Sequence, residues 1–338
     1  MRLLAAVAVA VPFAVGFGVQ SSSGAPGEEI TRFTDPELTE SSGAVVVGDR
    51  LWTVNDSGDA GRLFEVDLAT GDTLRTLPFD TDARDVEALA PQGRAAVWVG
   101  DTGDNLRRRD DVRITRVPLD GSAPTTWPLR LPDGPRDAEA LLRHPRTGRL
   151  FLVTKGVLEG EVLAVAEPQS PGTPQSPGTP LSAVRVASTA GMVTDGAFTP
   201  DGRHVVLRTY THAVVLAFPG WSRVGSFELP GQEQGEGLAV LPDGDLLLTS
   251  EGRNAPVLRV SVPRAVRRAM QEPDVAAPTD PSPTTTDSGT AVPDPDPTTG
   301  AGQQETTGAD EPEVWPWVLG GLLGLGVVLA LVRSLRRR

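Results

Sequence analysis

Five polar segments in the middle of this chain concentrate residue types that are almost absent elsewhere in it. The 338 residues include 31 basic side chains, of which one is Lys, together with one Tyr and three Asn. Each of the five segments that follow a short apolar run holds one of these rare residues, namely Asn55, Asn105, Lys155, Tyr210 and Asn254. Arg, Asp and Thr are the usual solvated residues of this chain, so the rare types indicate positions that need a particular chemistry.

A second set of residues is acidic and precedes the same apolar runs. A signature of an acid, a small residue and an apolar residue recurs at intervals of 41 to 56 residues. Its copies begin at Ser42, Glu87, Glu139, Asp195 and Glu236, with a hydroxyl in place of the acid in the first copy. Asp85 and Asp137 stand two residues before two of the acids. Carboxylates that recur at a fixed place in a repeat are expected to meet in space.

The elements that position these residues are predicted to be short strands. Each signature leads through a Gly-containing turn into one of five apolar runs, at 51–54, 95–99, 150–153, 204–207 and 246–248. Further Val- and Leu-rich runs follow, which makes about four strands in each unit of roughly 45 residues. We therefore expect an all-β fold, a single β-propeller of four-stranded blades over 28–271, with five blades and six as the alternative count. A β-sandwich is the rival fold.

The segment Glu28–Thr34 precedes the first unit, and the last unit lacks a fourth strand. We expect this segment to complete the last blade and to close the ring, which leaves no free sheet edge. In such a ring, the loops after the second strands and the crossovers into the innermost strands lie at one end of the channel. Both sets of chemically suggestive residues would then share one channel mouth.

The mouth is predicted to bind a cation and a ligand. Ca²⁺ takes oxygen ligands from carboxylates, amides and carbonyls, and the predicted ligands are Glu87, Asp101, Asn105, Glu139 and Glu236. The other residues predicted to bind a ligand are Asn55, Asp56, Asp85, Asp137, Lys155, Asp195, Arg208, Tyr210, Glu251, Arg253 and Asn254. Clustered carboxylates repel one another, so a metal or a basic partner is expected among them. The alternative is that each loop rich in Asp, Asn and Gly is a turn without a ligand.

The repeat resembles β-propellers of the NHL, SMP-30 and phytase-like kind. The resemblance rests on the acid–small–Leu–Ala openings, the Pro-Asp-Gly-Arg turn at 200–203 and the segment Leu-Phe-Glu-Val-Asp-Leu-Ala-Thr-Gly at 63–71, and it covers about 30–263. It implies Ca²⁺ at the central channel and, in several members, hydrolysis of phosphate esters or lactones. No complete catalytic set matches residue by residue, so the resemblance assigns no catalytic residue.

The two ends of the chain predict where the propeller works. Residues 1–27 have one Arg, an apolar stretch and small residues, as in a signal peptide, with an uncleaved N-terminal anchor as the alternative. Residues 272–313 hold ten acids and no basic residue among many Pro and Thr, which predicts a disordered stalk. An uncharged segment at 315–332 lies within a predicted transmembrane helix at 314–333, and the tail at 334–338 is basic. We expect a single-pass protein of the cell membrane, with the propeller outside and the tail cytoplasmic.

Composition excludes several function classes. The net charge is −13 and no segment of the propeller is strongly basic, which argues against nucleic-acid binding. The absence of Cys removes disulfides, thiolate metal sites and thiol nucleophiles. Two functions remain: a membrane-anchored propeller that binds a small anionic ligand, a glycan or a protein at its mouth with Ca²⁺, or a Ca²⁺-dependent extracytoplasmic hydrolase of phosphate esters or lactones.

Overall fold

The computed structural model describes residues 26–166 and 179–272. The predicted transmembrane helix, the basic tail, the stalk after Glu272 and the signal peptide up to residue 25 lie outside these residues. Among the described residues, no helix is long and apolar enough to cross a membrane.

The described chain is all-β and is built from antiparallel units of four strands. The first unit consists of β2 (Ser41–Val47), β3 (Arg50–Asn55), β4 (Gly61–Asp67) and β5 (Thr73–Asp80). The second consists of β6 (Val86–Gln92), β7 (Ala96–Asp101), β8 (Arg113–Pro118) and β9 (Thr125–Arg130). The third consists of β10 (Ala138–Arg143), β11 (Leu150–Thr154), β12 (Glu159–Val165) and β13 (Leu181–Ala190). A short parallel pairing of β9 with β13 joins the second and third units.

The remaining strands complete the arrangement in the same way. The fourth unit consists of β14 (Val193–Phe198), β15 (His204–Thr209), β16 (His212–Ala217) and β17 (Arg223–Glu228). The last consists of β18 (Gly235–Val240), β19 (Leu246–Ser250), β20 (Pro256–Val260) and β1 (Gly27–Arg32). A short helix, α2 (Arg264–Ala269), packs beside β17. Five second strands, β3, β7, β11, β15 and β19, fall on the five apolar runs that the sequence predicts to be strands.

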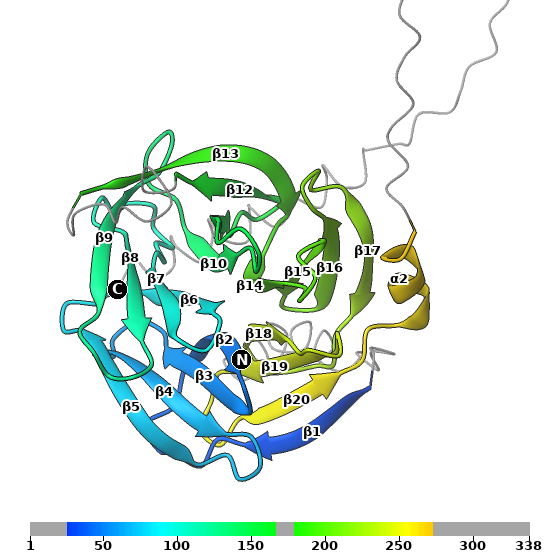
Figure 1. Cartoon of the computed structure of the whole chain (residues 1–338), viewed down its shortest axis with the longest axis horizontal. Coiled ribbons are helices and arrows are strands. Elements are labelled where there is room, and N and C mark those ends of the chain that lie inside the picture. The colour runs from blue at the N-terminus through cyan, green and yellow to red at the C-terminus, as the bar shows by residue number, and fades with distance from the viewer. Residues whose placement is uncertain (1–25, 167–178, 273–338) are drawn as a thin grey trace, which may run out of the picture. The chain divides into compact units, whose positions relative to one another are not determined.

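The units surround a common axis, as in a propeller (Figure 1). Their innermost strands contact one another in a closed cycle, from β2 through β6, β10, β14 and β18 back to β2. Five buried apolar clusters lie between successive units; one of them, for example, joins Trp52 and Leu63 of the first unit to Leu89 and Val97 of the second. Because every sheet buries both faces against its neighbours, the innermost and second strands are buried along most of their length.

The chain closes on itself through its first strand. Figure 1 shows β1 beside β20, and the two pair antiparallel from Gly27 opposite Val260 to Arg32 opposite Pro256. This confirms that Glu28–Thr34 supplies the missing strand of the last unit. Phe33 and Leu38, which follow β1, are buried in the cluster shared by the last and first units. The N-terminal strand therefore fastens the end of the repeat array to its beginning.

A single carboxylate ties three innermost strands together at the axis. Asp195 on β14 is fully buried and accepts hydrogen bonds from the backbone N–H groups of Ala44 on β2 (3.1 Å) and Leu238 on β18 (2.7 Å). It also accepts one from Gly196 (2.7 Å). Gly43 lets β2 approach β6 at this level, since a Cβ there would lie 2.7 Å from the Leu89 nitrogen. Asp195 therefore satisfies N–H groups that the crowded axis leaves without a strand partner.

Replacing Asp195 by Asn should destabilise the protein strongly. The amide can present only one oxygen, so at least one of the three buried N–H groups loses its acceptor, at a cost of about 1–3 kcal/mol each. We expect the free energy of unfolding, measured by urea denaturation at pH 7, to fall by at least about 1 kcal/mol. Glu233→Gln, an exposed carboxylate change, is the matched control and should leave stability unchanged. Equal stability of the two variants would contradict the role assigned to Asp195.

Candidate functional site

All five innermost strands are irregular at the same place, near their first residues. The ladder registers shift between Ser41 and Ala44, Val86 and Ala88, Ala138 and Ala140, Val193 and Asp195, and Gly235 and Leu238. Such β-bulges leave residues without a cross-strand partner and re-aim their side chains, and they are common beside functional sites. The skipped positions include Ser42, Glu87, Glu139, Thr194 and Glu236. The repeated signature is therefore a bulge that turns one side chain of each unit to the channel mouth.

The fourth unit differs from the prediction by one residue. Thr194, not Asp195, occupies the position of Glu87 and Glu139, and Asp195 lies one step further along the strand, where it points into the protein. The Thr194 hydroxyl donates to the Glu236 carbonyl (3.0 Å), just as the Ser42 hydroxyl lies 2.9 Å from the Glu87 carbonyl. Two units thus present hydroxyl groups that bind the backbone of the next unit, while three present acids.

Three carboxylates converge on one side of the mouth. Asp56, which follows β3, Asp85, which precedes β6, and Glu87 offer oxygens that all lie within 4.8 Å of one another. Burial raises the pKa of Asp85 to about 7, with further contributions from the charge of Asp56 and a hydrogen bond to it. Burial also raises the pKa of Glu87 well above its ordinary value, and the charge of Glu139 adds to this shift. Without a cation, this cluster must hold protons at neutral pH.

Gly103 is a site residue that sequence reasoning missed. A Cβ on Gly103 would lie 2.6 Å from the Asp85 carboxylate and 2.8 Å from the Glu87 Cγ, so this position admits no larger residue beside the cluster. Ser42 supports the cluster from the other side, with its hydroxyl 2.9 Å from the Glu87 Oε2 atom. The Gly within the acidic loop 101–105 is the signal that could have indicated this close approach.

The basic side of the mouth is formed by Lys155 and Tyr210. The Lys155 Nζ lies 3.1 Å from the Glu139 Oε1 and 5.3 Å from the centre of the Tyr210 ring, on which it makes a cation–π contact. Burial lowers the pKa of Lys155, but the Glu139 carboxylate more than compensates and holds the ammonium charged. Burial raises the pKa of Glu139 to about 9 in spite of Lys155. Below that pH, the pair carries the positive charge of Lys155 alone.

Glu236 and Arg208 form the third part of the site. Burial raises the pKa of Glu236 to about 7, and its Oε2 atom is buried with no hydrogen-bond partner among residues 26–166 and 179–272. Arg208 is buried behind it and donates to the carbonyls of Gly237 (2.6 Å) and Thr249 (2.7 Å). The Arg208 guanidinium therefore acts as a fixed positive charge that joins β15 to the last unit. It is not exposed to a ligand as the sequence interpretation expects.

The Asp101 carboxylate already accepts hydrogen bonds from four donors. Its two oxygens accept hydrogen bonds from Arg109 (2.7 Å) and Arg113 (3.0 Å) and from the backbone nitrogens of Arg84 and Asp85. This carboxylate holds the loop that carries Gly103 and is not available to a metal. Asn105, in the same loop, is exposed. The structure thus favours Asp56 and Asp85 over Asp101 and Asn105 as partners of Glu87.

The other Asn positions act as turn residues. The Asn55 amide accepts from the nitrogens of Thr39 and Glu40 (both 3.1 Å) and donates to the Glu37 carbonyl (2.7 Å), which fixes its own loop. Asn254 is exposed and adopts the left-handed backbone region with φ of 56°. Asn55 and Asn254 therefore act as turn residues, which is the alternative that the sequence leaves open for these loops.

The remaining predicted residues divide between the mouth and the surface. Asp137 is buried and accepts a hydrogen bond from the Asp104 nitrogen (2.8 Å). The pKa of Glu251 is raised by burial and by Asp56, which places this carboxyl in the field of the acidic cluster. Arg253 is exposed.

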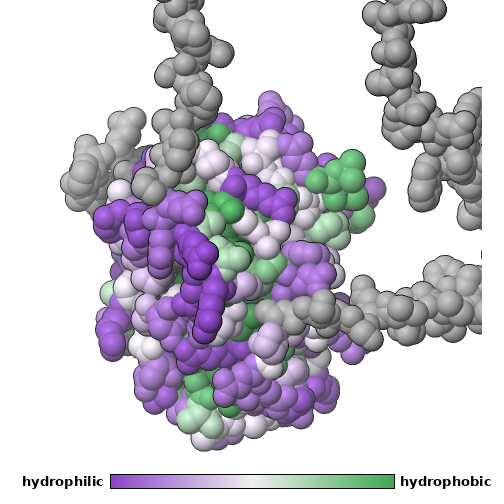
Figure 2. Space-filling model, turned by 90° about the vertical axis from the view of Figure 1, so that its right-hand side faces the viewer, coloured by the Kyte–Doolittle hydropathy of each residue, from purple (hydrophilic) through white to green (hydrophobic). Residues whose placement is uncertain are grey.

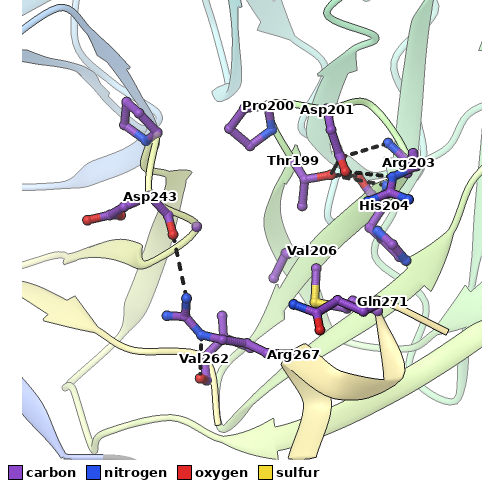
Figure 3. Close-up of a pocket in the computed structure, with 13 residues that line it drawn as sticks. Thr199, Pro200, Asp201, Arg203, His204, Val206, Asp243, Val262, Arg267 and Gln271 are labelled. Atoms are coloured by element: carbon purple, nitrogen blue, oxygen red, sulfur yellow. Dashed lines mark hydrogen bonds and ion pairs between the residues drawn. The ribbon is translucent and has the colours of Figure 1, made fainter. Parts of the chain in front are cut away.

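The side of the molecule that carries α2 offers a different kind of surface. It is mostly hydrophilic, with small hydrophobic areas between polar ones (Figure 2). A groove of about 290 Å³ near α2 has several of its polar groups engaged (Figure 3). Asp201 pairs with Arg203 (2.7 Å), and the Arg267 Nε donates to the Val262 carbonyl (2.9 Å). Asp201, Arg203 and Arg267 are thus engaged within the protein.

Comparison with known proteins identifies neither a family nor an activity for this chain. No family model and no curated protein matches the chain. Solved structures that resemble it include the β-propeller domain of Cps50 (Swd1) from Myceliophteria thermophila, with 13% identity and a TM-score of 0.38 over 67% of this chain and 65% of that one. A glucose dehydrogenase matches with 14% identity and a TM-score of 0.43 over 72% of this chain and 94% of that one. The resemblance to the NHL, SMP-30 and phytase-like group remains a prediction.

The buried carboxyl groups of Asp85 and Glu236 make the stability of the protein depend on pH in a defined direction. Asp85 and Glu236 have a pKa of about 7 in the folded protein, against about 4 in an unfolded chain. The folded state therefore binds more protons between these values, and the stabilisation present below about pH 4 is lost as the pH rises through about 7. We expect the free energy of unfolding, measured in chelator, to fall from pH 5.5 to 8.5. Glu236→Gln should flatten this slope, and a stability that rises over the same range would contradict the assignment.

The contributions of Lys155 and Glu139 to the free energy of unfolding should depend on each other. Lys155→Met removes the counter-charge of a carboxylate that is only 1% exposed, and breaking a buried pair costs about 3–5 kcal/mol. We expect a loss of about 3 kcal/mol in urea denaturation at pH 10, where Glu139 is ionised, and a smaller loss at pH 7, below its pKa of about 9. The double variant Lys155→Met/Glu139→Gln should lose less than the sum of the two single variants. Additive losses would show that the two side chains act independently.

Proposed function

We propose that this chain is an exported, membrane-anchored five-bladed propeller that binds Ca²⁺ at its channel mouth and, beside it, a small anionic ligand. One observation carries the proposal, namely the approach of Asp56, Asp85 and Glu87 oxygens to within 4.8 Å of one another. Oxygens that share one Ca²⁺ at about 2.4 Å lie at most about 4.8 Å apart, so these three suit a common ion. A divalent cation would also offset the mutual repulsion that raises their pKa values.

The blade count in this proposal rests on the grouping of strands. Each four-stranded unit contributes one innermost strand to a single closed cycle, and one apolar cluster separates each unit from the next. The membrane anchor and the export signal rest on the sequence of the two ends alone.

The position of Lys155 supports an anionic ligand. Its ammonium lies at the same mouth as the three carboxylates, is 15% exposed and is held by Glu139 and the Tyr210 ring. A cation at the acidic cluster and an ammonium beside it would attract a carboxylate, phosphate or acidic sugar between them. The Tyr210 hydroxyl adds a neutral hydrogen-bonding group.

The alternative is a Ca²⁺-dependent hydrolase of phosphate esters or lactones, which one observation favours. Asp85 and Glu236 have a pKa of about 7, the range in which a carboxylate serves as a general base at neutral pH. Turnover of such esters by the wild type, with a loss of at least about 100-fold in kcat for Glu236→Gln, would assign this alternative. Ligand binding without turnover would retain the binding function.

Calcium binding tests the proposal directly. We expect the purified full-length chain to bind Ca²⁺ in isothermal titration calorimetry, with proton release that varies with the ionisation enthalpy of the buffer. Asp85→Asn should weaken binding at least about tenfold, because a charged ligand becomes neutral. Affinity should also rise with pH through about 7, where Asp85 loses its proton.

The control lies in the same segment of chain. Asp82→Asn removes one carboxylate that is exposed and three residues before Asp85, so it matches the change in net charge and should leave Ca²⁺ affinity unchanged. Equal weakening by both variants would reduce the effect to general electrostatics, and no binding by the wild type would refute the metal site.

A further inference from the structure

The central channel has a second compartment on the far side of Asp195. A cavity of about 340 Å³ is lined by residues of all five innermost strands, among them Val45, Leu89, Leu141, Ala197 and Val240. Gly196 and Ala44 also line it, and both donate backbone hydrogen bonds to Asp195. The Asp195 carboxylate and its three bonds therefore lie between this cavity and the acidic mouth. The two compartments open toward opposite ends of the channel.

The second compartment is almost wholly apolar in its side chains. Apart from Arg143 at the end of β10, its lining consists of Ala, Val, Leu, Pro, Phe and Gly residues and Thr199. The Thr199 hydroxyl is already engaged with Asp201 (2.7 Å) and with the backbone of His204 (3.1 Å). One polar side chain therefore remains to orient a ligand in a cavity of the size and character of small-molecule sites.

Arg143 is a half-buried cation that forms no salt bridge with any other described residue. Burial lowers its pKa, and Arg116, a like charge, lowers it further. No acidic group of the described chain acts to raise it. By contrast, Arg109 pairs with Asp101 (2.7 Å) and Arg113 pairs with Asp80 (3.0 Å). A partly desolvated guanidinium at an apolar wall leaves a hydrogen-bonding demand that an anion would satisfy.

We propose that this compartment is a binding site for a small amphipathic anion, such as an aliphatic carboxylate. Its apolar tail would lie against the walls formed by the innermost strands, and its carboxylate would pair with Arg143. The site is separate from the acidic mouth and does not depend on Ca²⁺. It also selects the opposite charge from the acidic cluster: a cation fits the mouth, whereas an anion with an apolar tail fits here.

Octanoate is the probe that tests this site, in isothermal titration calorimetry on the purified full-length chain in chelator. We expect octanoate to bind, and Arg143→Met to weaken it at least about tenfold, since a charge-assisted pair is lost while the apolar length is kept. Ala197→Phe should weaken binding to the same extent by filling the cavity while leaving Arg143 in place. Octanol has the apolar tail without the negative charge, and sulfate has the charge without the tail. Each should therefore bind at least about tenfold more weakly than octanoate.

Arg146→Met is the matched control, because this exposed residue lies in the turn that follows Arg143 and is not among the residues that line the cavity. It should change octanoate affinity less than about twofold. Thermal unfolding of each variant reports whether it is folded. The proposal is overturned if octanoate does not bind, if folded Arg143→Met binds it as the wild type does, or if sulfate binds equally well.

Discussion

The pairing of β1 with β20 is the interaction on which the other features of this protein depend. It joins the beginning of the repeat array to its end, so that five innermost strands must converge on one axis. Convergence brings residues that are 41 to 56 positions apart in the chain to one small space. Every unusual property of the mouth follows from that: buried acids, raised pKa values and an ammonium retained among carboxylates. An open array of the same strands would leave these side chains apart and solvated.

Convergence also creates a difficulty that Asp195 resolves. Innermost strands that bulge at their first residues lose regular hydrogen-bond partners where the backbone is most buried, and unsatisfied N–H groups there are costly. A carboxylate with three backbone donors meets this need at one point. Burial raises the pKa of Asp195 well above its ordinary value, and the three N–H groups and Arg208 oppose this shift only in part. The result is a fixed partition across the channel, with acidic groups on one side and apolar walls on the other.

Much of the fold could be predicted from the sequence, because each unit repeats the same turn and apolar run, and because Glu28–Thr34 fitted nowhere except the last sheet. The mouth was also predictable as a place, since Lys155 and Tyr210 follow the second strands of their units, Glu87 opens an innermost strand, and both places lie at one end of a propeller channel. What could not be predicted was the role of each polar residue. Asp101 and Asp56 look alike in sequence, yet only the structure shows that Arg109 and Arg113 occupy the first. Asp195 and Thr194 differ by one position, and a strand reverses its facing side with each residue.

The departures from the repeat are more informative than the repeat itself. If five equivalent acids lined the axis, their repulsion would be symmetric and no point of the mouth would differ from another. Ser42 and Thr194 interrupt the acidic series and separate Glu236 from the neighbouring acids Glu87 and Glu139. Of these two acids, Glu87 groups with Asp56 and Asp85, whereas Glu139 pairs with Lys155. One group is suited to a cation and the other already contains one. A ligand that spans them must present opposite charges to the two groups or bring a metal ion with it, and this restricts what the mouth can bind more sharply than its net acidity does.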